Sequence, residues 1–246
     1  MELVYPPVVI AAKAMFKILG MKLNVQGSEH IPADGGAVIA CTHQSYLDFI
    51  FCGLGAQPSK RLVRFMAKKQ VFDNRISGPL MRGMRHIPVD RAVGKAAYDE
   101  AVDRLRNGEV VGVFPEATIS RSFTVKELKS GSVRMAADAG VPIVPMAIWG
   151  TQRLWTKGKP RRLTQRGVPV SILAGAPFSG DEGASVEDLT VQLRTRMQEL
   201  LDTVQADYPD KPADTADTWW LPAHLGGTAP TPEEAADMDR RRPESA

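Results

Sequence analysis

The chain has 246 residues, of which 43% are hydrophobic and 24% are charged, so it is long enough to bury the core of one mixed α/β domain. No run approaches the roughly 20 apolar residues that a bilayer-spanning helix needs, which excludes a protein built from such helices. The two cysteines, Cys41 and Cys52, are too few for a disulfide framework. They lie in apolar segments and are expected in the core of a protein from a reducing compartment.

The net charge of +3 is unevenly distributed. Nine acidic residues against four basic ones give residues 207–246 a charge of −5, which leaves +8 for residues 1–206. A basic body suits an anionic partner, such as lipid headgroups, a phosphorylated substrate, an acidic carrier protein or nucleic acid. Nucleic acid is disfavoured because the aromatic residues do not interleave with the basic ones.

The first predicted element is a helix over residues 8–19, with Pro6 and Pro7 suited to its start. Lys13 and Lys17 share one face, and apolar residues cover much of the rest. This pattern fits an amphipathic helix lying in a membrane interface, and it fits a helix docked on the domain core equally well. Further lysines downstream favour the membrane.

Strand-like and helical patterns then alternate over residues 25–206, which predicts an α/β domain with a central, largely parallel sheet flanked by helices. The N-terminal amphipathic segment is assigned to residues 1–24. Strands are expected over residues 37–41, 62–67, 86–89, 109–114, 143–148 and 168–174. Helices are expected over residues 46–55, 76–83, 92–107, 125–139 and 186–205.

Two further segments differ in composition from this domain. Residues 207–246 are rich in proline, alanine and charge, so we expect an extended or disordered tail. Its tryptophans, Trp219 and Trp220, are expected to pack back on the body or to touch a membrane interface. Residues 150–166 form a basic loop, which fits either a solvated turn or a clamp for an anionic donor or headgroup.

The most informative chemical feature is a histidine and a carboxylate five residues apart, His43 and Asp48. An imidazole can take a proton from a hydroxyl near neutral pH, and a carboxylate on its other nitrogen fixes the tautomer. The two side chains can meet if His43 lies in the turn after a strand and Asp48 in the first turns of the next helix. An unrelated loop histidine and a helix-start aspartate fit the spacing equally well.

Four blocks together extend this feature: His43–Asp48, Ile87–Arg91, Phe114–Ile119 and Val141–Pro145. In this order they resemble the glycerol-phosphate acyltransferase superfamily, most closely the bacterial 1-acylglycerol-3-phosphate acyltransferases. The family patterns are H-x4-D, a block ending in arginine, F-P-E-G-T-R and V-P-I-V-P. The resemblance covers about residues 25–175, and it extends to a lysine-bearing segment at residues 67–70.

The resemblance implies a role for each matched residue. His43 would be the general base that deprotonates the acceptor hydroxyl, and Asp48 would hold its imidazole. The acceptor hydroxyl would then attack the thioester of acyl-CoA or acyl-carrier protein directly, so the protein needs no nucleophile of its own. Substrate-binding roles, to the phosphate or the glycerol oxygens of the acceptor, would fall to Lys68, Arg91, Glu116 and Thr118.

The third block departs from the family pattern, since it reads E-A-T-I where the family has E-G-T-R. Ala117 replaces the glycine, which predicts a turn that does not need a positive φ angle. Ile119 replaces the arginine, which removes one expected phosphate contact, and Arg121 is the nearest candidate to supply it. The acceptor is therefore either lysophosphatidic acid or another glycerophosphate or glycolipid.

The predicted function is a peripheral acyltransferase on the cytoplasmic face of the cell membrane, with a lysophospholipid acceptor and no cofactor beyond the acyl donor. A metal-dependent phosphoesterase using His43, Asp48 and Glu116 as ligands is a weaker alternative, because no tight His/Asp cluster recurs. A metal site is therefore not expected. A noncatalytic lipid-binding protein is the remaining alternative.

Overall fold

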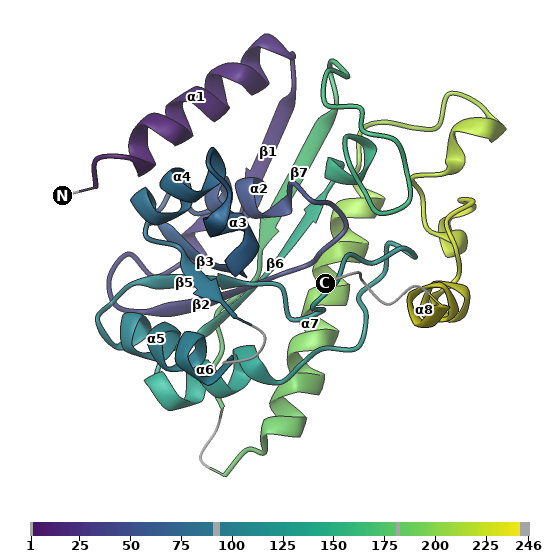
Figure 1. The fold of residues 1–246 in the computed structure, drawn as a ribbon. Coiled ribbons are helices and arrows are strands. Elements are labelled where there is room, and N and C mark those ends of the chain that lie inside the picture. The colour runs from purple at the N-terminus through teal and green to yellow at the C-terminus, as the bar shows by residue number, and fades with distance from the viewer. Residues whose placement is uncertain (1, 91–93, 181–182, 242–246) are drawn as a thin grey trace.

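The computed structural model describes residues 2–90, 94–180 and 183–241. Seven strands form one sheet in the order β1-β7-β6-β2-β5-β3-β4, with helices on both faces (Figure 1). Among the six strand pairs of these residues, β6 with β7 is antiparallel and the other five are parallel. The strands are β1 Lys22–Gln26, β2 Ala37–Cys41, β3 Val63–Lys68, β4 Ile87–Val89, β5 Val110–Val113, β6 Ile143–Trp149 and β7 Pro169–Ala174. The predicted α/β fold is confirmed.

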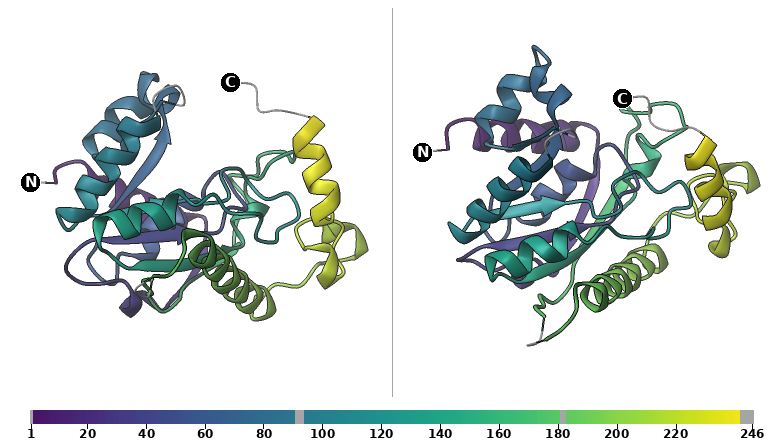
Figure 2. Two further views of the ribbon diagram at one scale, coloured as in Figure 1. Left: turned by 90° about the horizontal axis from the view of Figure 1, so that it is seen from below. Right: turned by 60° about the horizontal axis from the view of Figure 1, so that its bottom comes forward.

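Five of the described helices cover the two faces of this sheet. The described α-helices are α1 Tyr5–Ile18, α2 Asp48–Gly55, α3 Lys69–Asp73, α4 Ser77–Gly83, α5 Gly94–Arg106, α6 Gly131–Ala139, α7 Val186–Ala206 and α8 Pro232–Arg241. Helices α5, α6 and α7 contribute to the hydrophobic cluster on one face, and α1 and α2 to the cluster on the other. In the two views of Figure 2, α8 lies at the opposite side of the molecule from the N-terminus.

Strand β2 lies between these clusters and is buried along its whole length. Successive side chains of a strand point to opposite faces, so Val38 and Ala40 pack with α5–α7 whereas Ile39 and Cys41 pack with α1 and α2. Cys41 and Cys52 are both buried and carry free thiols, as the sequence predicted. The turn that follows β2 therefore starts from a strand fixed on both sides.

Several predicted boundaries differ from the structure for local reasons. Helix α2 starts at Asp48 instead of residue 46, because Asp48 bonds the amides of the preceding turn. Helix α6 starts at Gly131 instead of residue 125, because the N–H of Lys129 donates to the carbonyl of Pro115 and not to that of Val125. Strand β1 was not predicted. It is a short, largely exposed edge strand, K-L-N-V-Q, whose two apolar residues alternate with polar ones, and it pairs with β7.

For residues 207–241 the prediction of an extended or disordered tail was wrong, because α8 forms within them, whereas the expectation that the tryptophans pack back on the body is confirmed for Trp220. Trp220 is 1% exposed and packs edge-to-face on Tyr208, which ties the chain back to the body. Helix α8 then begins with a reciprocal cap, in which Thr231 Oγ1 accepts the N–H of Glu234 and Glu234 Oε2 accepts the N–H of Thr231. This T-x-x-E capping box satisfies two donors at the helix start, and it is readable in the sequence.

Helix α1 is docked on one side and exposed on the other. Tyr5 donates from its hydroxyl to the carbonyl of Val63 at 3.0 Å, and Phe16 stacks on Phe51 at 4.9 Å between ring centroids. Ile10 and Ile18 are 67% and 69% exposed. Within the described residues no helix combines the length and apolar character needed to cross a membrane.

Candidate functional site

Three neighbouring parallel strands, β6, β2 and β5, deliver side chains to one edge of the sheet. His43 follows β2 by two residues, Glu116 follows β5 by three, and Thr151 follows β6 by two. The carboxyl ends of adjacent parallel strands are where open α/β sheets place ligands. The structure thus brings residues from distant parts of the sequence to one place.

The histidine and the carboxylate of the first motif meet as the spacing allowed. His43 lies in the turn before α2, Asp48 is the first residue of α2, and His43 Nδ1 is 3.1 Å from Asp48 Oδ2. Because a carboxylate accepts, Nδ1 carries the proton and Nε2 is left with its lone pair. The His43 side chain is 19% exposed whereas Asp48 is fully buried. This is the arrangement of an oriented general base.

Asp48 receives three further hydrogen bonds besides that from His43. Its Oδ2 accepts the backbone N–H groups of Gln44 and Ser45 at 2.7 Å, and its Oδ1 accepts the hydroxyl of Thr151 at 2.6 Å. Together these bonds fix the position of the carboxylate, which in turn orients the imidazole of His43. Sequence reasoning missed Thr151, which lies 103 residues from Asp48.

Glu116 is buried and binds the backbone on either side of it. Its Oε1 accepts the backbone N–H of His43 at 2.8 Å, and its Oε2 accepts the backbone N–H of Lys126 at 3.1 Å. Burial raises the pKa of the Glu116 carboxyl to about 8, although these two backbone donors lower it. Glu116 thus holds the backbone of His43 in place, and its predicted contact with substrate stays a prediction.

An aromatic run leads from His43 to helix α1. The imidazole stacks on Phe114 with ring centroids 4.3 Å apart, and Phe114 stacks on Phe65 at 6.3 Å. Phe65 and Tyr5 both line a small apolar cavity of about 60 Å³ between α1 and α2. Ring contacts therefore connect His43 through Phe114 and Phe65 to the cavity beneath α1.

The remaining predicted substrate-binding residues have different outcomes. Lys68 ends β3 at the same edge of the sheet and is exposed. Arg91 lies outside the described residues. Thr118 accepts a hydrogen bond from Lys126 Nζ at 2.6 Å, so its hydroxyl oxygen is bound to a cation. Lys126 itself was missed by sequence reasoning.

The departure from the family pattern in the third block has structural consequences. Ala117 has φ 62°, so the prediction that this turn avoids a positive φ was wrong. Alanine is strained there because its Cβ crowds the backbone. Ile119 is 4% exposed and packs inward, so its position contributes nothing to a ligand. Arg121 is half-buried and ion-pairs with Asp239.

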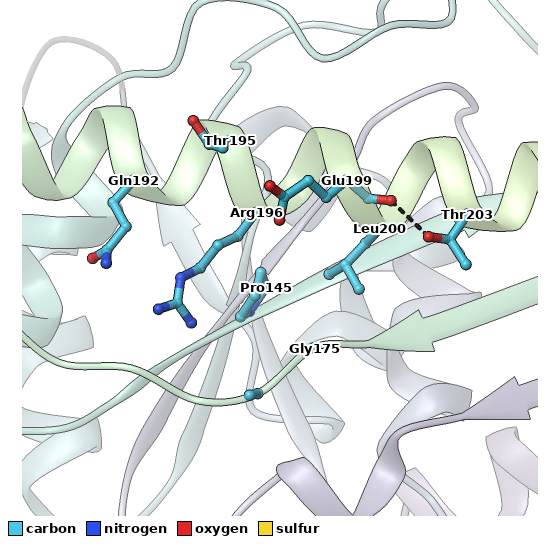
Figure 3. Close-up of a pocket in the computed structure, with 9 residues that line it drawn as sticks. Pro145, Gly175, Gln192, Thr195, Arg196, Glu199, Leu200 and Thr203 are labelled. Atoms are coloured by element: carbon cyan, nitrogen blue, oxygen red, sulfur yellow. Dashed lines mark hydrogen bonds between the residues drawn. The ribbon is translucent and has the colours of Figure 1, made fainter.

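A cavity of about 590 Å³ lies away from this edge, on the flank of α7. Figure 3 shows Gln192, Arg196 and Glu199 projecting from α7 over Pro145 and Gly175. It contains none of the predicted site residues. Across residues 2–90, 94–180 and 183–241, no group of three His, Cys, Asp or Glu side chains is arranged to hold a metal ion.

Comparisons with known proteins give the family of the chain. The model of the Acyltransferase family matches residues 22–149. The chain is 32% identical over 189 residues to a 1-acyl-sn-glycerol-3-phosphate acyltransferase of Bacillus subtilis, covering 74% of this chain and 93% of that one. A chloroplast enzyme of the same name from Arabidopsis thaliana is 28% identical over 186 residues, and this chain spans 49% of its length.

A solved structure is similar over most of the chain. The crystal structure of the 1-acyl-sn-glycerophosphate acyltransferase PlsC from Thermotoga maritima superposes with a TM-score of 0.69 at 28% sequence identity. The match covers 83% of this chain and 81% of that one. His43, Asp48, Glu116 and Thr118 all lie within residues 22–149, whereas Thr151 and α8 lie beyond them.

Proposed function

Because the chain belongs to the Acyltransferase family, we propose that it transfers a fatty acyl chain to the free hydroxyl of 1-acylglycerol 3-phosphate. The product is phosphatidic acid, and the donor is acyl-CoA or acyl-carrier protein. The single observation that carries this proposal is the buried, four-times-bonded Asp48 holding the Nδ1–H of His43. The names of the similar proteins support the choice of acceptor.

The proposed reaction needs no nucleophile from the protein. His43 Nε2 removes the proton of the acceptor hydroxyl as its oxygen attacks the thioester carbonyl, and an oxyanion forms. Asp48 stabilises the imidazolium without moving. Collapse of the oxyanion breaks the carbon–sulfur bond, and the thiol leaves with the proton that His43 had taken. The products are one ester and one free thiol.

The acceptor is tested by a screen of thiol release from palmitoyl-CoA on vesicles. We expect release with lysophosphatidic acid to exceed release with a lysolipid that lacks the phosphate monoester, because orienting the hydroxyl needs fixed cations at the phosphate. The buried Ile119 makes a different glycerolipid acceptor the second candidate. Equal or greater release with a glycolipid acceptor would favour that candidate.

We further propose that the protein binds the cytoplasmic face of the membrane peripherally through α1 and α4. Leu3, Ile10, Ile18, Ile76 and Leu80 are 42–81% exposed on these elements or beside them. Tyr5 packs with Phe72, Met81 and Met84 beneath α1, so the two helices belong to one face. Apolar side chains flanked by the exposed lysines of α1 are typical of interfacial helices.

Vesicle binding tests this assignment. Ile10→Asp together with Ile18→Asp is expected to lower binding to anionic vesicles by at least 10-fold, since two buried aliphatic contacts contribute about 2–4 kcal/mol. Val191→Asp on α7 is the matched control, because Val191 is 61% exposed on another helix. Equal binding of all three proteins would place the membrane face elsewhere.

A further inference from the structure

Three cations converge on one carboxylate of the C-terminal helix. Asp239 Oδ1 is 3.1 Å from Arg121 Nε and 2.9 Å from Lys157 Nζ, and its Oδ2 is 2.7 Å from Lys126 Nζ. The three basic side chains are 13–28% exposed, so they are partly removed from solvent. One negative charge faces three positive ones, and this excess is suited to an anion of higher charge than a carboxylate.

This cation cluster, Arg121, Lys126 and Lys157, is joined to the reactive turn by short bonds. Lys126 Nζ donates to Thr118 Oγ1 at 2.6 Å, and the Lys126 backbone N–H donates to Glu116. The other oxygen of Glu116 holds the His43 backbone N–H. One side chain therefore separates the backbone of His43 from that of Lys126. The cluster is thus linked through Glu116 to the turn that holds His43.

Helix α8, which carries Asp239, is held to the rest of the molecule by few contacts. Ala235 is its buried residue, and Met238 is 45% exposed. The helix lies beyond residues 22–149, which match the family model, whereas Arg121 and Lys126 lie within them. Burial would raise the pKa of Asp239, but hydrogen bonds from Lys126, Lys157 and Arg121 lower it to about 2. The carboxylate is therefore charged at any physiological pH.

We propose that Asp239 occupies the binding site of a substrate phosphate group, so that α8 is a displaceable cap over the reaction site. A phosphate ester offers more negative charge and more acceptor oxygens than a carboxylate, and the same three cations can bind it. The ester belongs either to the acceptor headgroup or to the phosphates of the acyl donor. This inference rests on the proposed acyl transfer, because it assigns the cluster to a substrate of that reaction.

Kinetics of Asp239→Asn test the proposal. An internal ligand that occupies the site lowers apparent substrate affinity by the fraction of time it is bound. We expect the KM of one phosphorylated substrate to fall about 10-fold while kcat stays the same, since removing the charge frees the cluster. Asp237→Asn is the matched control, because Asp237 lies on α8 but is exposed and pairs with Arg240. Its KM values should equal those of the wild type.

Two arms identify the source of the phosphate. The KM of lysophosphatidic acid is measured at saturating palmitoyl-CoA, and the KM of palmitoyl-CoA at saturating lysophosphatidic acid. A lower KM in the first arm assigns the cluster to the acceptor, and a lower KM in the second assigns it to the donor. Adding Lys157→Gln to Asp239→Asn should raise that same KM again. Unchanged or higher KM values for both substrates in Asp239→Asn would overturn the proposal.

Hydrogen exchange gives a readout that does not depend on catalysis. Inorganic phosphate should speed amide exchange over residues 232–241 relative to chloride at equal ionic strength, because it competes with Asp239 for the cluster. Equal exchange rates in the two salts would overturn the proposal that an anion displaces α8. If the wild type releases no thiol with any acceptor, the acyl-transfer proposal fails, and the exchange result still decides whether an anion displaces α8.

Discussion

Two buried carboxylates flank the reactive turn, and they differ in the number of hydrogen bonds that each receives. Asp48 accepts four donors, three of them from the turn that contains His43. Glu116 accepts two backbone N–H groups and has its pKa raised to about 8 by burial. Asp48 receives the imidazole N–H and can act on His43 directly, whereas both printed donors of Glu116 are backbone N–H groups, so Glu116 acts on the turn.

The strongest test of this difference applies the same change to both residues. Asp48→Asn removes the anion from His43 and should lower acyl transfer by about 10²–10⁴-fold, the usual effect of disabling a general base. Glu116→Gln should lower it far less, since the carboxyl does not contact the imidazole. Thiol release per folded protein, with thermal midpoints as the check on folding, compares the two. Equal losses of acyl transfer in the two variants would show that Asp48 and Glu116 do not have different roles.

The pH dependence of stability separates the same pair in a second way. The Glu116 pKa is raised above its ordinary 4.5. Its stabilisation of the fold is therefore complete below about pH 4.5 and is lost as the pH rises toward 8. The free energy of unfolding should fall by roughly 3–5 kcal/mol across that window through this one group.

Denaturant titrations at pH 5 and pH 8 measure this fall. In Glu116→Gln the free energy of unfolding should fall less between pH 5 and pH 8 than in the wild type, because an amide does not ionise. The variant is expected to be less stable than the wild type at pH 5, since its NH₂ faces a backbone donor. Glu199→Gln on α7 is the control and should keep the wild-type slope, as Glu199 is exposed. If the free energy of unfolding of Glu116→Gln depended on pH as that of the wild type does, Glu116 would be ionised over the whole range from pH 5 to pH 8.

Thr151 offers a milder test of how the Asp48 bonds act. Thr151→Val removes one of four donors, and we expect about 10-fold lower acyl transfer with a stability loss of about 1 kcal/mol. Thr156→Val is the matched control, because this equally buried hydroxyl donates to the Gln44 carbonyl at 2.6 Å instead of to Asp48. The control should lose similar stability but less activity. Similar activity losses would mean that the bond to Asp48 is not special.

The smallest expected effect concerns Ala117 in the Glu116 segment. Its φ of 62° is unfavourable for alanine but not for glycine. Ala117→Gly should therefore raise the free energy of unfolding by about 0.5–1 kcal/mol. Ala137→Gly, at an exposed site within α6, should lower it by a similar amount because glycine weakens a regular helix. If both glycine variants were less stable than the wild type, the claim that Ala117 is strained would be contradicted.

The sequence predicted those parts of the molecule whose signal is a local pattern of residues or a set of motifs in a known order. The apolar runs gave the six core strands, and the five-residue spacing of His43 and Asp48 is met by a turn followed by a helix start. Thr151 carried no local signal, because its partner lies 103 residues away. The positive φ of Ala117 was not predicted, because alanine rarely adopts that conformation. Helix α8 has a capping box that can be read in the sequence. The high content of charge and proline in residues 207–246 nevertheless favoured a prediction of disorder.

The central claim is that His43 is the general base of acyl transfer to a substrate hydroxyl. The most direct measurement is thiol release from palmitoyl-CoA with lysophosphatidic acid on vesicles, for the wild type and for His43→Ala. Loss of the base should lower the rate by about 10²–10⁴-fold while the thermal midpoint stays close to that of the wild type. A folded His43→Ala protein with near-normal release would contradict the account.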